Sequence, residues 1–468
     1  MCDSTEKMEF ICVADDGWCF EAEGGEPFVP WGVNYSTQGT GWPPDMWSDE
    51  HFQPDKIKAD FETMADLGVN VTKVVFPTER IVEVEDKQVE LNQKTLDRFE
   101  VLREAAREHR IRLVVSVNDS WPDYPDWFKF ESEESNRILA ALWSRLATRF
   151  RDDPLIMGYS FAVEEDIHPW RELEGPWKEW LRHTYGSLKA LNEAWGTSFA
   201  QFESIPVPAG SRGQNAENWW LYPEGTEQNT SLTNDPALYD FQRYRREIAR
   251  RWILAQYEAV KQAAPRQLAS FGMIQWSGFI RNLLEPVNEG PFGANPFDPH
   301  WIADGQDFMA PHFYPVLPPM GGQEFQLRYA QLWLRYCYVG KPVVLEEFNF
   351  IEDNATWCRR LVEATREDAS GWMVWTFQNY PNTDNITEVC GLIDEERKLT
   401  EWGHLFREMA PEVKSWKLRR RPATRTVTLP ERWLLTSGQY RRETDEIIRS
   451  TPLTEAIDIE IKQERAPE

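Results

Sequence analysis

The feature that most limits the fold of this chain is a regular alternation of strand-like and helix-like segments. Short apolar runs rich in β-branched residues alternate with longer segments in which apolar residues recur every three or four positions. Strands are predicted at residues 28–35, 69–76, 112–117, 155–163, 267–274, 307–312, 342–347 and 371–377, and helices at 55–67, 96–108, 133–150, 325–338 and 356–367. This alternation predicts an α/β fold, a (β/α)8 TIM barrel that ends near Met409.

Segments outside this alternation divide the chain further. A turn signal at Asp15-Asp16-Gly17 predicts a hairpin, and a stretch rich in Trp, Pro and Gly interrupts the barrel after its fourth strand. We therefore predict an N-terminal hairpin at 1–27, the barrel at 28–412 with a long insertion at 167–233, and a short C-terminal β-like tail at 413–468 with strand-like pieces at 424–429, 433–436 and 457–462. Loops at the carboxyl ends of barrel strands build the active-site wall, so the insertion is expected to shape the pocket.

Two of the predicted strands end in carboxylates. The run DPLIMGYSFAVEED at 153–166 ends in three acids, and KPVVLEEFNF at 341–350 contains Glu346 and Glu347. One such cluster would more often be a solvated loop, but two at one edge of a sheet supply the acid and the carboxylate of glycoside hydrolysis. Because neighbouring side chains on a strand point to opposite faces, Glu346 and Glu347 are not expected in the same site.

Composition narrows the choice of partners. A net charge of −26 disfavours nucleic acid and anionic membranes, which require basic patches. The 23 Trp and 14 Tyr offer aromatic faces for sugar rings, so an oligosaccharide is the expected substrate. No secretory signal, membrane-length apolar run, glycine-rich phosphate loop or metal-ligand spacing is found, and the six cysteines are scattered. We expect a cytoplasmic protein without cofactor or metal, with homo-oligomerisation left open.

The strand motifs resemble those of clan A glycoside hydrolases, which are retaining β-glycosidases. FVPWGVNY, DPLIMGYSFAVEE, HFYP, KPVVLEEF and GWMVWTF resemble strands one, four, six, seven and eight of family 5 mannanase-like barrels. The insertion segment YGSLKALNEAWGTSF, at 185–199, is more similar to family 42 β-galactosidases. The resemblance covers residues 28–409 and implies an acid/base after strand four and a nucleophile after strand seven.

This resemblance selects two glutamates. In the relatives the acid/base follows the strand-four glycine by six positions, which gives Glu164, and the nucleophile follows the strand-seven proline by five, which gives Glu347. Glu164 also shares a predicted strand face with the small residues Ser160 and Ala162. Glu164 is expected to hold a proton at rest and donate it to the leaving oxygen, and Glu347 to attack the anomeric carbon from about 5 to 5.5 Å away.

Other strand-end residues are implied to bind substrate. His312 and Tyr314 would hydrogen-bond the nucleophile or the sugar, with a structural histidine as the alternative, and Trp375 would stack on the sugar, with an ordinary core tryptophan as the alternative. Lys73 occupies the place of a strand-two arginine, and Val163 the place of the asparagine that contacts the sugar 2-OH in the relatives. The remaining pocket candidates are Asn118, Gln275, Trp276 and Trp42.

The sequence leaves three interpretations open. The leading one is an exo-acting retaining β-glycosidase for β-mannoside or β-galactoside oligosaccharides, because a walled pocket admits only chain ends. The second is an endo-β-mannanase with an open cleft. The third, motivated by Val163, is a catalytically weak carbohydrate-binding barrel.

Overall fold

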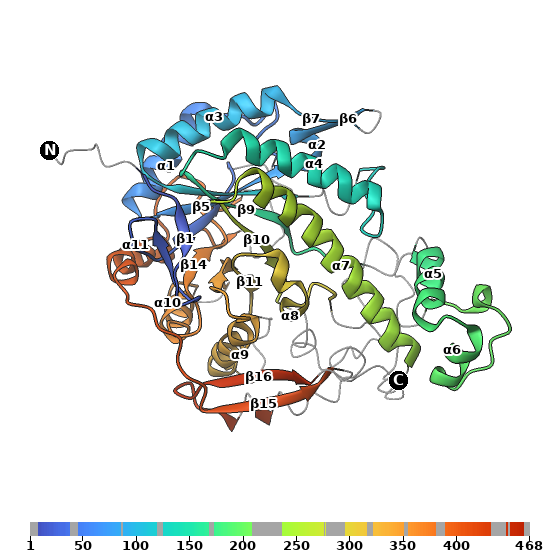
Figure 1. The fold of residues 1–468 in the computed structure, drawn as a ribbon. Helices are drawn as coiled ribbons and strands as arrows, with labels where there is room; N and C mark the ends of the chain where they lie inside the picture. Colours follow the sequence, from blue (N-terminus) through green and yellow to red (C-terminus); the bar gives the residue numbers. More distant parts are fainter. Residues whose placement is uncertain are drawn as a thin grey trace.

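The chain is arranged around one ring of parallel strands. A computed structural model describes residues 8–37, 45–85, 88–118, 125–167, 173–207, 236–275, 277, 295–315, 322–350, 354–380, 389–431, 446–447 and 450–462. Figure 1 shows the strands surrounded by helices, with the long helix α7 (Pro236–Ala263) crossing the molecule beside the green insertion helices.

Nine short strands build the ring. They are β4 (Trp31–Tyr35), β5 (Val71–Pro77), β8 (Arg112–Asn118), β9 (Ile156–Val163), β10 (Leu268–Met273), β11 (Ala310–Phe313), β12 (Val344–Leu345), β13 (Glu347–Phe348) and β14 (Gly371–Val374). The sheet begins with β12, which pairs with β14, and ends with β13, which pairs with β11. Since β12 and β13 are two halves of the seventh strand, the ring closes with eight parallel strand positions. The predicted (β/α)8 TIM barrel is confirmed.

The helices that cover the ring include α1 (Pro54–Asp66), α2 (Thr78–Ile81), α3 (Gln93–Glu108), α4 (Glu133–Phe150), α8 (Pro299–Ile302), α9 (Gly322–Cys337), α10 (Asn354–Ala364) and α11 (Glu401–Lys414). Of these, α1, α3, α4, α9 and α10 begin and end near the predicted residues, whereas α2, α8 and α11 were not predicted. Local capping fixes several starts: the side chains of Asn92, Ser132 and Thr400 each accept a hydrogen bond from a backbone N–H in the first turn of α3, α4 and α11.

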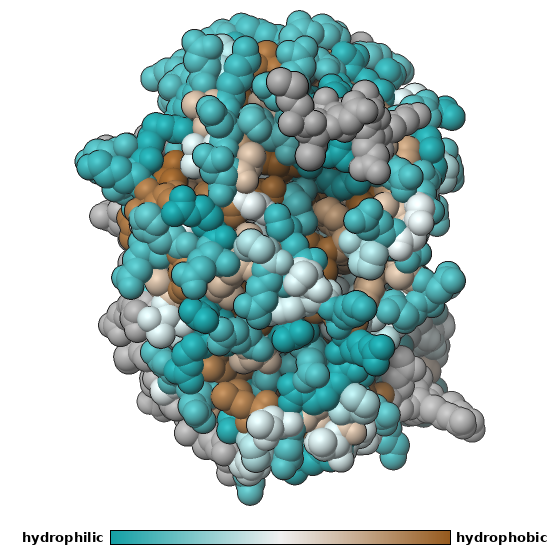
Figure 2. All heavy atoms as spheres, turned by 90° about the vertical axis from the view of Figure 1, so that its left-hand side faces the viewer, coloured by the Kyte–Doolittle hydropathy of each residue, from teal (hydrophilic) through white to brown (hydrophobic). Residues whose placement is uncertain are grey.

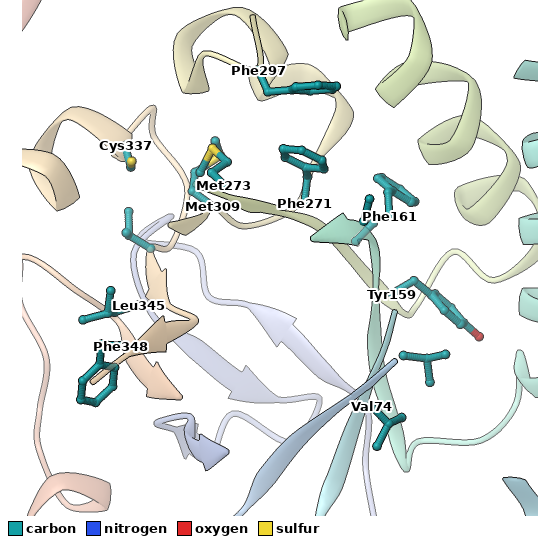
Figure 3. Close-up of a cluster of buried hydrophobic side chains, with 14 of the residues drawn as sticks. Val74, Tyr159, Phe161, Phe271, Met273, Phe297, Met309, Cys337, Leu345 and Phe348 are labelled. Carbon is teal, nitrogen blue, oxygen red and sulfur yellow. The ribbon is translucent and has the colours of Figure 1, made fainter. Parts of the chain in front are cut away.

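Side chains on the outer side of the strands pack against these helices. Trp143 of α4 meets Tyr159 and Phe161 of β9 edge-on, with ring centroids 5.7 and 5.5 Å apart, and Phe271 of β10 stacks on Phe297 at 4.6 Å. Figure 3 shows Phe161, Phe271 and Phe297 among these buried side chains. Aromatic pairs of this kind add to the free energy of burial. The alternate residues of β10, including Gly272, therefore face the barrel interior.

Several boundaries differ from the predictions. Phe28 belongs to the small strand β3 (Pro27–Phe28), which joins β1 (Ile11–Val13) and β2 (Phe20–Ala22) in an antiparallel sheet, so the first barrel strand begins at Trp31. A hairpin of β6 (Val82–Glu85) and β7 (Gln88–Leu91), which was not predicted, follows strand two. Strand seven is interrupted at Glu346.

Additional elements lie outside the ring. In the insertion, α5 (Glu174–Tyr185) and α6 (Leu188–Trp195) lie near the start of α7 (Figure 1), while residues 168–172 and 208–235 fall outside the described part. The tail forms two parallel strands, β15 (Arg425–Pro430) and β16 (Ile457–Lys462). Arg335 of α9 holds β16 through Asp458, with Nη2 2.6 Å from Oδ1. The predicted strand at 433–436 lies outside the described residues.

The surface of the described part is mainly polar. Figure 2 shows a face covered largely by hydrophilic residues, with hydrophobic ones gathered in its hollows. Val389, at 44%, is the only large hydrophobic side chain that is exposed among the described residues. Within the same residues no helix has the length and apolar character of a membrane span, and no disulfide bond links the cysteines.

Candidate active site

Glu164 reaches the barrel mouth through an irregular end of strand four. Ser160 of β9 lies opposite Ser270 of β10, but Val163 lies opposite Gly272, so β9 holds one extra residue between these two pairs. Glu164 follows with a left-handed φ of 59°, and its N–H donates to the Gly272 carbonyl at 2.8 Å. The argument that Glu164 shares a face with Ser160 and Ala162 was therefore wrong, because the extra residue breaks the two-residue period.

The two residues that follow Glu164 are held by partners outside the cluster of glutamates. The Glu165 carbonyl accepts a hydrogen bond from Asn295 Nδ2 at 2.9 Å, and the buried Asp166 pairs with Arg245 of α7 at 2.8 Å. Arg245 also donates from Nε to the Ile167 carbonyl at 2.7 Å. These contacts fix the backbone just after Glu164, which helps to hold that residue in its left-handed conformation.

The end of strand seven differs from the prediction. Glu346 and Glu347 were expected to face opposite sides, but both carboxylates lie within 4 Å of the same lysine and the same histidine. The alternation fails because the strand is interrupted at Glu346, which belongs neither to β12 nor to β13. The side chain of Glu346 is 0% exposed and that of Glu347 5% exposed.

His312, at the end of β11, connects the three glutamates. Its Nδ1 lies 2.7 Å from Glu164 Oε1 and 3.3 Å from Glu347 Oε2, and its Nε2 lies 3.3 Å from Glu346 Oε2. One carboxylate oxygen of Glu164, one of Glu347 and a ring nitrogen of His312 all lie within 4.8 Å of one another. The structure thus brings together both predicted acids and the predicted strand-six histidine.

Two more predicted residues complete this cluster. Lys73 of β5, fully buried, places Nζ 2.6 Å from Glu346 Oε2 and 3.8 Å from Glu347 Oε1. Tyr314 donates its hydroxyl hydrogen to Glu347 Oε2 at 2.8 Å. Among the described residues Glu347 Oε1 is buried without a hydrogen-bond partner.

Burial and neighbouring charges set the protonation of the cluster. Burial disfavours the charged imidazole, yet the charge of Glu347 and the hydrogen bonds to Glu164 and Glu346 outweigh it and raise the pKa of His312 to about 9. Burial alone would raise the pKa of Glu346, but the charges of Lys73 and His312 hold it below its ordinary value. Burial raises the pKa of Glu347 against the opposing charges of His312 and Lys73.

Two residues that support the cluster were not predicted. Asn34 of β4 donates from Nδ2 to the Glu346 carbonyl at 2.8 Å and so holds the interrupted strand. Gly272 lies close to both groups: a Cβ at this position would be 3.0 Å from His312 Nε2 and 3.1 Å from Glu346 Oε2. A polar residue in the first strand was a visible signal for Asn34, whereas the need for glycine at 272 arises only from strands that meet in space.

Of the remaining predicted pocket residues, some lie near the cluster and others fall outside the described part of the structure. Gln275 Oε1 accepts a hydrogen bond from the Tyr314 N–H, so Gln275 lies at the same mouth. Trp375 is 8% exposed, and its ring centroid lies 6.4 Å from that of Tyr380. Asn118 ends β8, but its side chain, like Trp42 and Trp276, lies outside the described residues.

Glu164, His312 and Glu347 are also close enough to surround one cation. A metal ligand must offer a lone pair, whereas both nitrogens of His312 face carboxylate oxygens and are placed to donate hydrogen bonds. The arrangement therefore fits proton chemistry better than metal coordination.

Part of the chain is similar in sequence to known β-galactosidases. Residues 125–292 match the family model described as β-galactosidase. The β-galactosidase YesZ of Bacillus subtilis (strain 168) is 21% identical over 204 residues, which cover 36% of this chain and 29% of that protein. This chain therefore spans less than a third of that relative.

Solved structures share the fold over nearly the whole chain. The exo-β-1,4-mannosidase Op5Man5 from Opitutaceae bacterium strain TAV5 superposes with a TM-score of 0.63 at 18% identity, covering 96% of this chain and 72% of that one. A β-galactosidase from Bacillus circulans sp. alkalophilus gives a TM-score of 0.69 at 16% identity, covering 93% and 65%. The closed barrel is therefore shared with these glycosidases, and residues 125–292 are similar to the family described as β-galactosidase.

Proposed function

We propose that the chain is an exo-acting retaining β-glycosidase in which Glu347 is the nucleophile and Glu164 the acid/base. The observation that carries the proposal is the short separation of these side chains, whose nearest carboxylate oxygens lie within 4.8 Å. Retaining glycosidases hold their carboxyl groups about 5 to 5.5 Å apart, whereas inverting ones leave roughly 6.5 to 9.5 Å for a water molecule.

The surroundings of each acid suit its proposed role. Glu347 attacks the anomeric carbon, and Tyr314 keeps its carboxylate in place through a 2.8 Å hydrogen bond to Oε2. Glu164, whose side chain is 30% exposed, passes a proton to the departing oxygen. A water molecule that has lost its proton to Glu164 then cleaves the glycosyl-enzyme ester, which restores both groups.

A β-galactoside is the first substrate to test, and a β-mannoside the second. Both sequence matches are to β-galactosidases, over residues 125–292 for the family model. The mannoside is favoured by the exo-β-1,4-mannosidase that superposes over 96% of this chain. Exo action is supported by the insertion after strand four, whose helices α5 and α6 add wall next to the acid/base strand.

The direct test is the stereochemistry of hydrolysis. Proton NMR of a nitrophenyl β-galactoside or β-mannoside digest should show the β-anomer of the free sugar first, because double displacement retains configuration. Glu347→Ala should lose at least about 10⁴-fold in kcat and recover activity with azide, giving an α-glycosyl azide. First appearance of the α-anomer, or near-normal turnover by the variant, would remove the proposal.

The same assays separate the alternatives. Release of internal fragments from a mannan would favour an endo-β-mannanase, and the absence of hydrolysis with retained sugar binding would favour a carbohydrate-binding barrel. Location in the cytoplasm and self-association remain predictions, to be checked by cell fractionation and by light scattering.

A further inference from the structure

His312 faces acids on both sides of its ring. Nδ1 lies 2.7 Å from Glu164 Oε1, and Nε2 lies 3.3 Å from Glu346 Oε2. A neutral imidazole carries one N–H and one lone pair, so it can donate a hydrogen bond on only one of these sides. The second contact requires either a second ring proton or a proton on the facing carboxyl group. The protein must therefore keep at least one shared proton in this row of groups.

Glu346 is built to stay anionic and in place. Its Oε2 lies 2.6 Å from Lys73 Nζ, and both side chains are 0% exposed. Asn34 holds its backbone carbonyl at 2.8 Å, and Gly272 leaves room for the contact between Glu346 and His312. A buried carboxylate paired with a lysine does not give up its charge readily. The Nε2 side of His312 is thus committed to a hydrogen bond to Glu346.

We propose that Glu346 is a positioning residue that fixes the Nε2–H of His312, so that Nδ1 shares with Glu164 the proton that the reaction delivers to the leaving group. This inference rests on the proposed function and adds to it. Glu346 would contact neither the sugar nor the reacting atoms, and would act entirely through the histidine.

The proton balance of the cycle is simple. At rest, one proton lies between Glu164 Oε1 and His312 Nδ1, so the pair is either a carboxylic acid with a neutral imidazole or a carboxylate with an imidazolium. When Glu347 forms its bond to the anomeric carbon, the bond to the leaving oxygen breaks and that oxygen takes the shared proton from Glu164. The water that cleaves the ester returns one proton to the pair. No oxidant, reductant or metal is needed.

The other charged neighbours support this assignment. Besides Glu164 on strand four and Glu346 on strand seven, the ring meets Glu347, with Nδ1 3.3 Å from Oε2. Lys73 approaches through Glu346 from strand two, Tyr314 through Glu347 from strand six, and the described residues of β10 add no charge there. The acids outweigh burial and raise the pKa of His312 to about 9, so the ring can hold the second proton at neutral pH.

The protonation of His312 can be measured without any substrate. The chain has seven histidines, so nitrogen-15 NMR of histidine-labelled protein, assigned with a His312→Gln variant, follows this ring alone. Glu346→Gln should move its titration to lower pH by about one pH unit or more, because an anionic partner is lost. Lys73→Met should move it to higher pH, because Glu346 loses its competing cation.

A matched variant controls for general disturbance. Asp368, which is 3% exposed, pairs with Arg335 at 2.8 Å just before strand eight, at the other end of the barrel. Asp368→Asn also removes a buried carboxylate, yet should leave the His312 titration where it is. If Glu346→Gln does not fold, the charge-balanced double variant with Lys73→Met takes its place and is compared with Lys73→Met alone, relative to which its His312 titration should lie at lower pH. Absence of the Nε2 proton in the wild type at pH 7, or an unchanged titration in the variant, would overturn the proposal.

Kinetics then test whether the shared proton is the one used. In Glu346→Gln, kcat/KM for an alkyl β-glycoside should fall about 10- to 100-fold and its alkaline limb should move to lower pH, since general acid catalysis contributes about 10²–10⁴. A dinitrophenyl glycoside, which needs no protonation, should lose only a few-fold. Equal losses on both substrates would refute the role of Glu346. If the wild type hydrolyses no glycoside, the proposed function fails, and the NMR titration still decides the inference.

Discussion

The two strands that carry the acids reach the active site in different ways. Strand four delivers one glutamate through an extra residue and a left-handed turn, and its side chain is 30% exposed. Strand seven breaks at Glu346 and turns two carboxylates into the barrel, with exposures of 0% and 5%. Glu164 is open to water and, in the proposed function, to the leaving group, while Glu346 and Glu347 form a buried, charged site next to Lys73 and His312. This difference in exposure between the acids comes from the irregular ends of the two strands and not from their regular parts.

The largest effect on activity is expected from a substitution at the end of strand four. Glu164→Gln should lower kcat/KM for an alkyl β-glycoside by about 10²–10⁴-fold, because the amide cannot donate the acidic proton. Glu165→Gln changes the next side chain, whose backbone is held by Asn295 at 2.9 Å, and should cost far less. Both variants are assayed with alkyl and dinitrophenyl glycosides.

The leaving group makes this test specific. With the dinitrophenyl substrate, Glu164→Gln should cause almost no loss of rate in the first step, because that leaving group departs as an anion and needs no proton. If Glu165→Gln shows the leaving-group dependence and Glu164→Gln does not, the acid/base has been assigned to the wrong neighbour.

The buried cluster around His312 is tested by the dependence of folding stability on pH. His312 titrates near 6.5 when unperturbed, and the surrounding acids raise its pKa to about 9 in the folded protein. A group whose pKa is raised on folding stabilises the fold fully below about pH 6.5, and this contribution is lost as the pH rises through 9. Its size is on the order of 3 kcal/mol.

Urea unfolding of the wild type and His312→Asn at pH 6 and pH 10 measures that contribution. The free energy of unfolding should differ more between the two proteins at pH 6 than at pH 10, because other titrating groups are common to both. An equal difference at the two pH values would mean that the acids do not hold the proton on this ring.

Gly272 lies between the two strand ends, so a substitution there tests how tightly His312 and Glu346 are held. In Gly272→Ala the new Cβ would lie 3.0 Å from His312 Nε2 and 3.1 Å from Glu346 Oε2. Displacing these groups by a few tenths of an ångström should lower kcat/KM about tenfold and cost about 1–3 kcal/mol of stability. Gly175→Ala in α5, which meets nothing within 4 Å, is the matched control and should be neutral or slightly stabilising. Similar behaviour of both variants would show that the contact is not tight.

Much of the fold could be predicted because its signals are local. Helix α4 runs from Glu133 to Phe150 as predicted, since its Ser132 cap and its apolar spacing are read within one segment. The hairpin of β6 and β7 was missed, although valines alternating with acids in VEVE, the whole of β6, were a visible strand signal. The pairing of β12 and β13 with different neighbours could not be predicted, because it depends on how the ring closes.

The sequence predicted which residues form the site better than it predicted how they are arranged. Counting from the strand landmarks of the resembling family selected Glu164 and Glu347, and the resemblance of strand six selected His312; the structure has the three within 4.8 Å of one another. The two alternation arguments failed because an extra residue and a strand break are set by contacts with neighbouring strands, which no single segment encodes. For the same reason neither Asn34 nor the pairing of Lys73 with Glu346 was foreseen.

The smallest expected effect lies at the other end of the barrel and sets the scale for the rest. Asp458 of β16, 28% exposed, accepts hydrogen bonds from Arg335 and Arg420, each at 2.6 Å. Asp458→Asn removes one carboxylate charge, as Glu164→Gln does, but in a partly solvated setting where such pairs contribute about 0.2–1 kcal/mol.

We therefore expect Asp458→Asn to lower the urea midpoint slightly and to leave kcat/KM and its pH profile unchanged. A carboxylate lost at the strand ends then costs activity, and one lost where the tail meets α9 costs only a little stability, although both acids bind cationic or donor groups at similar distances. A loss of several kcal/mol, or a fall in kcat/KM, would mean instead that β15 and β16 support the barrel mouth through α9. The tail would then have to be counted as part of the catalytic unit.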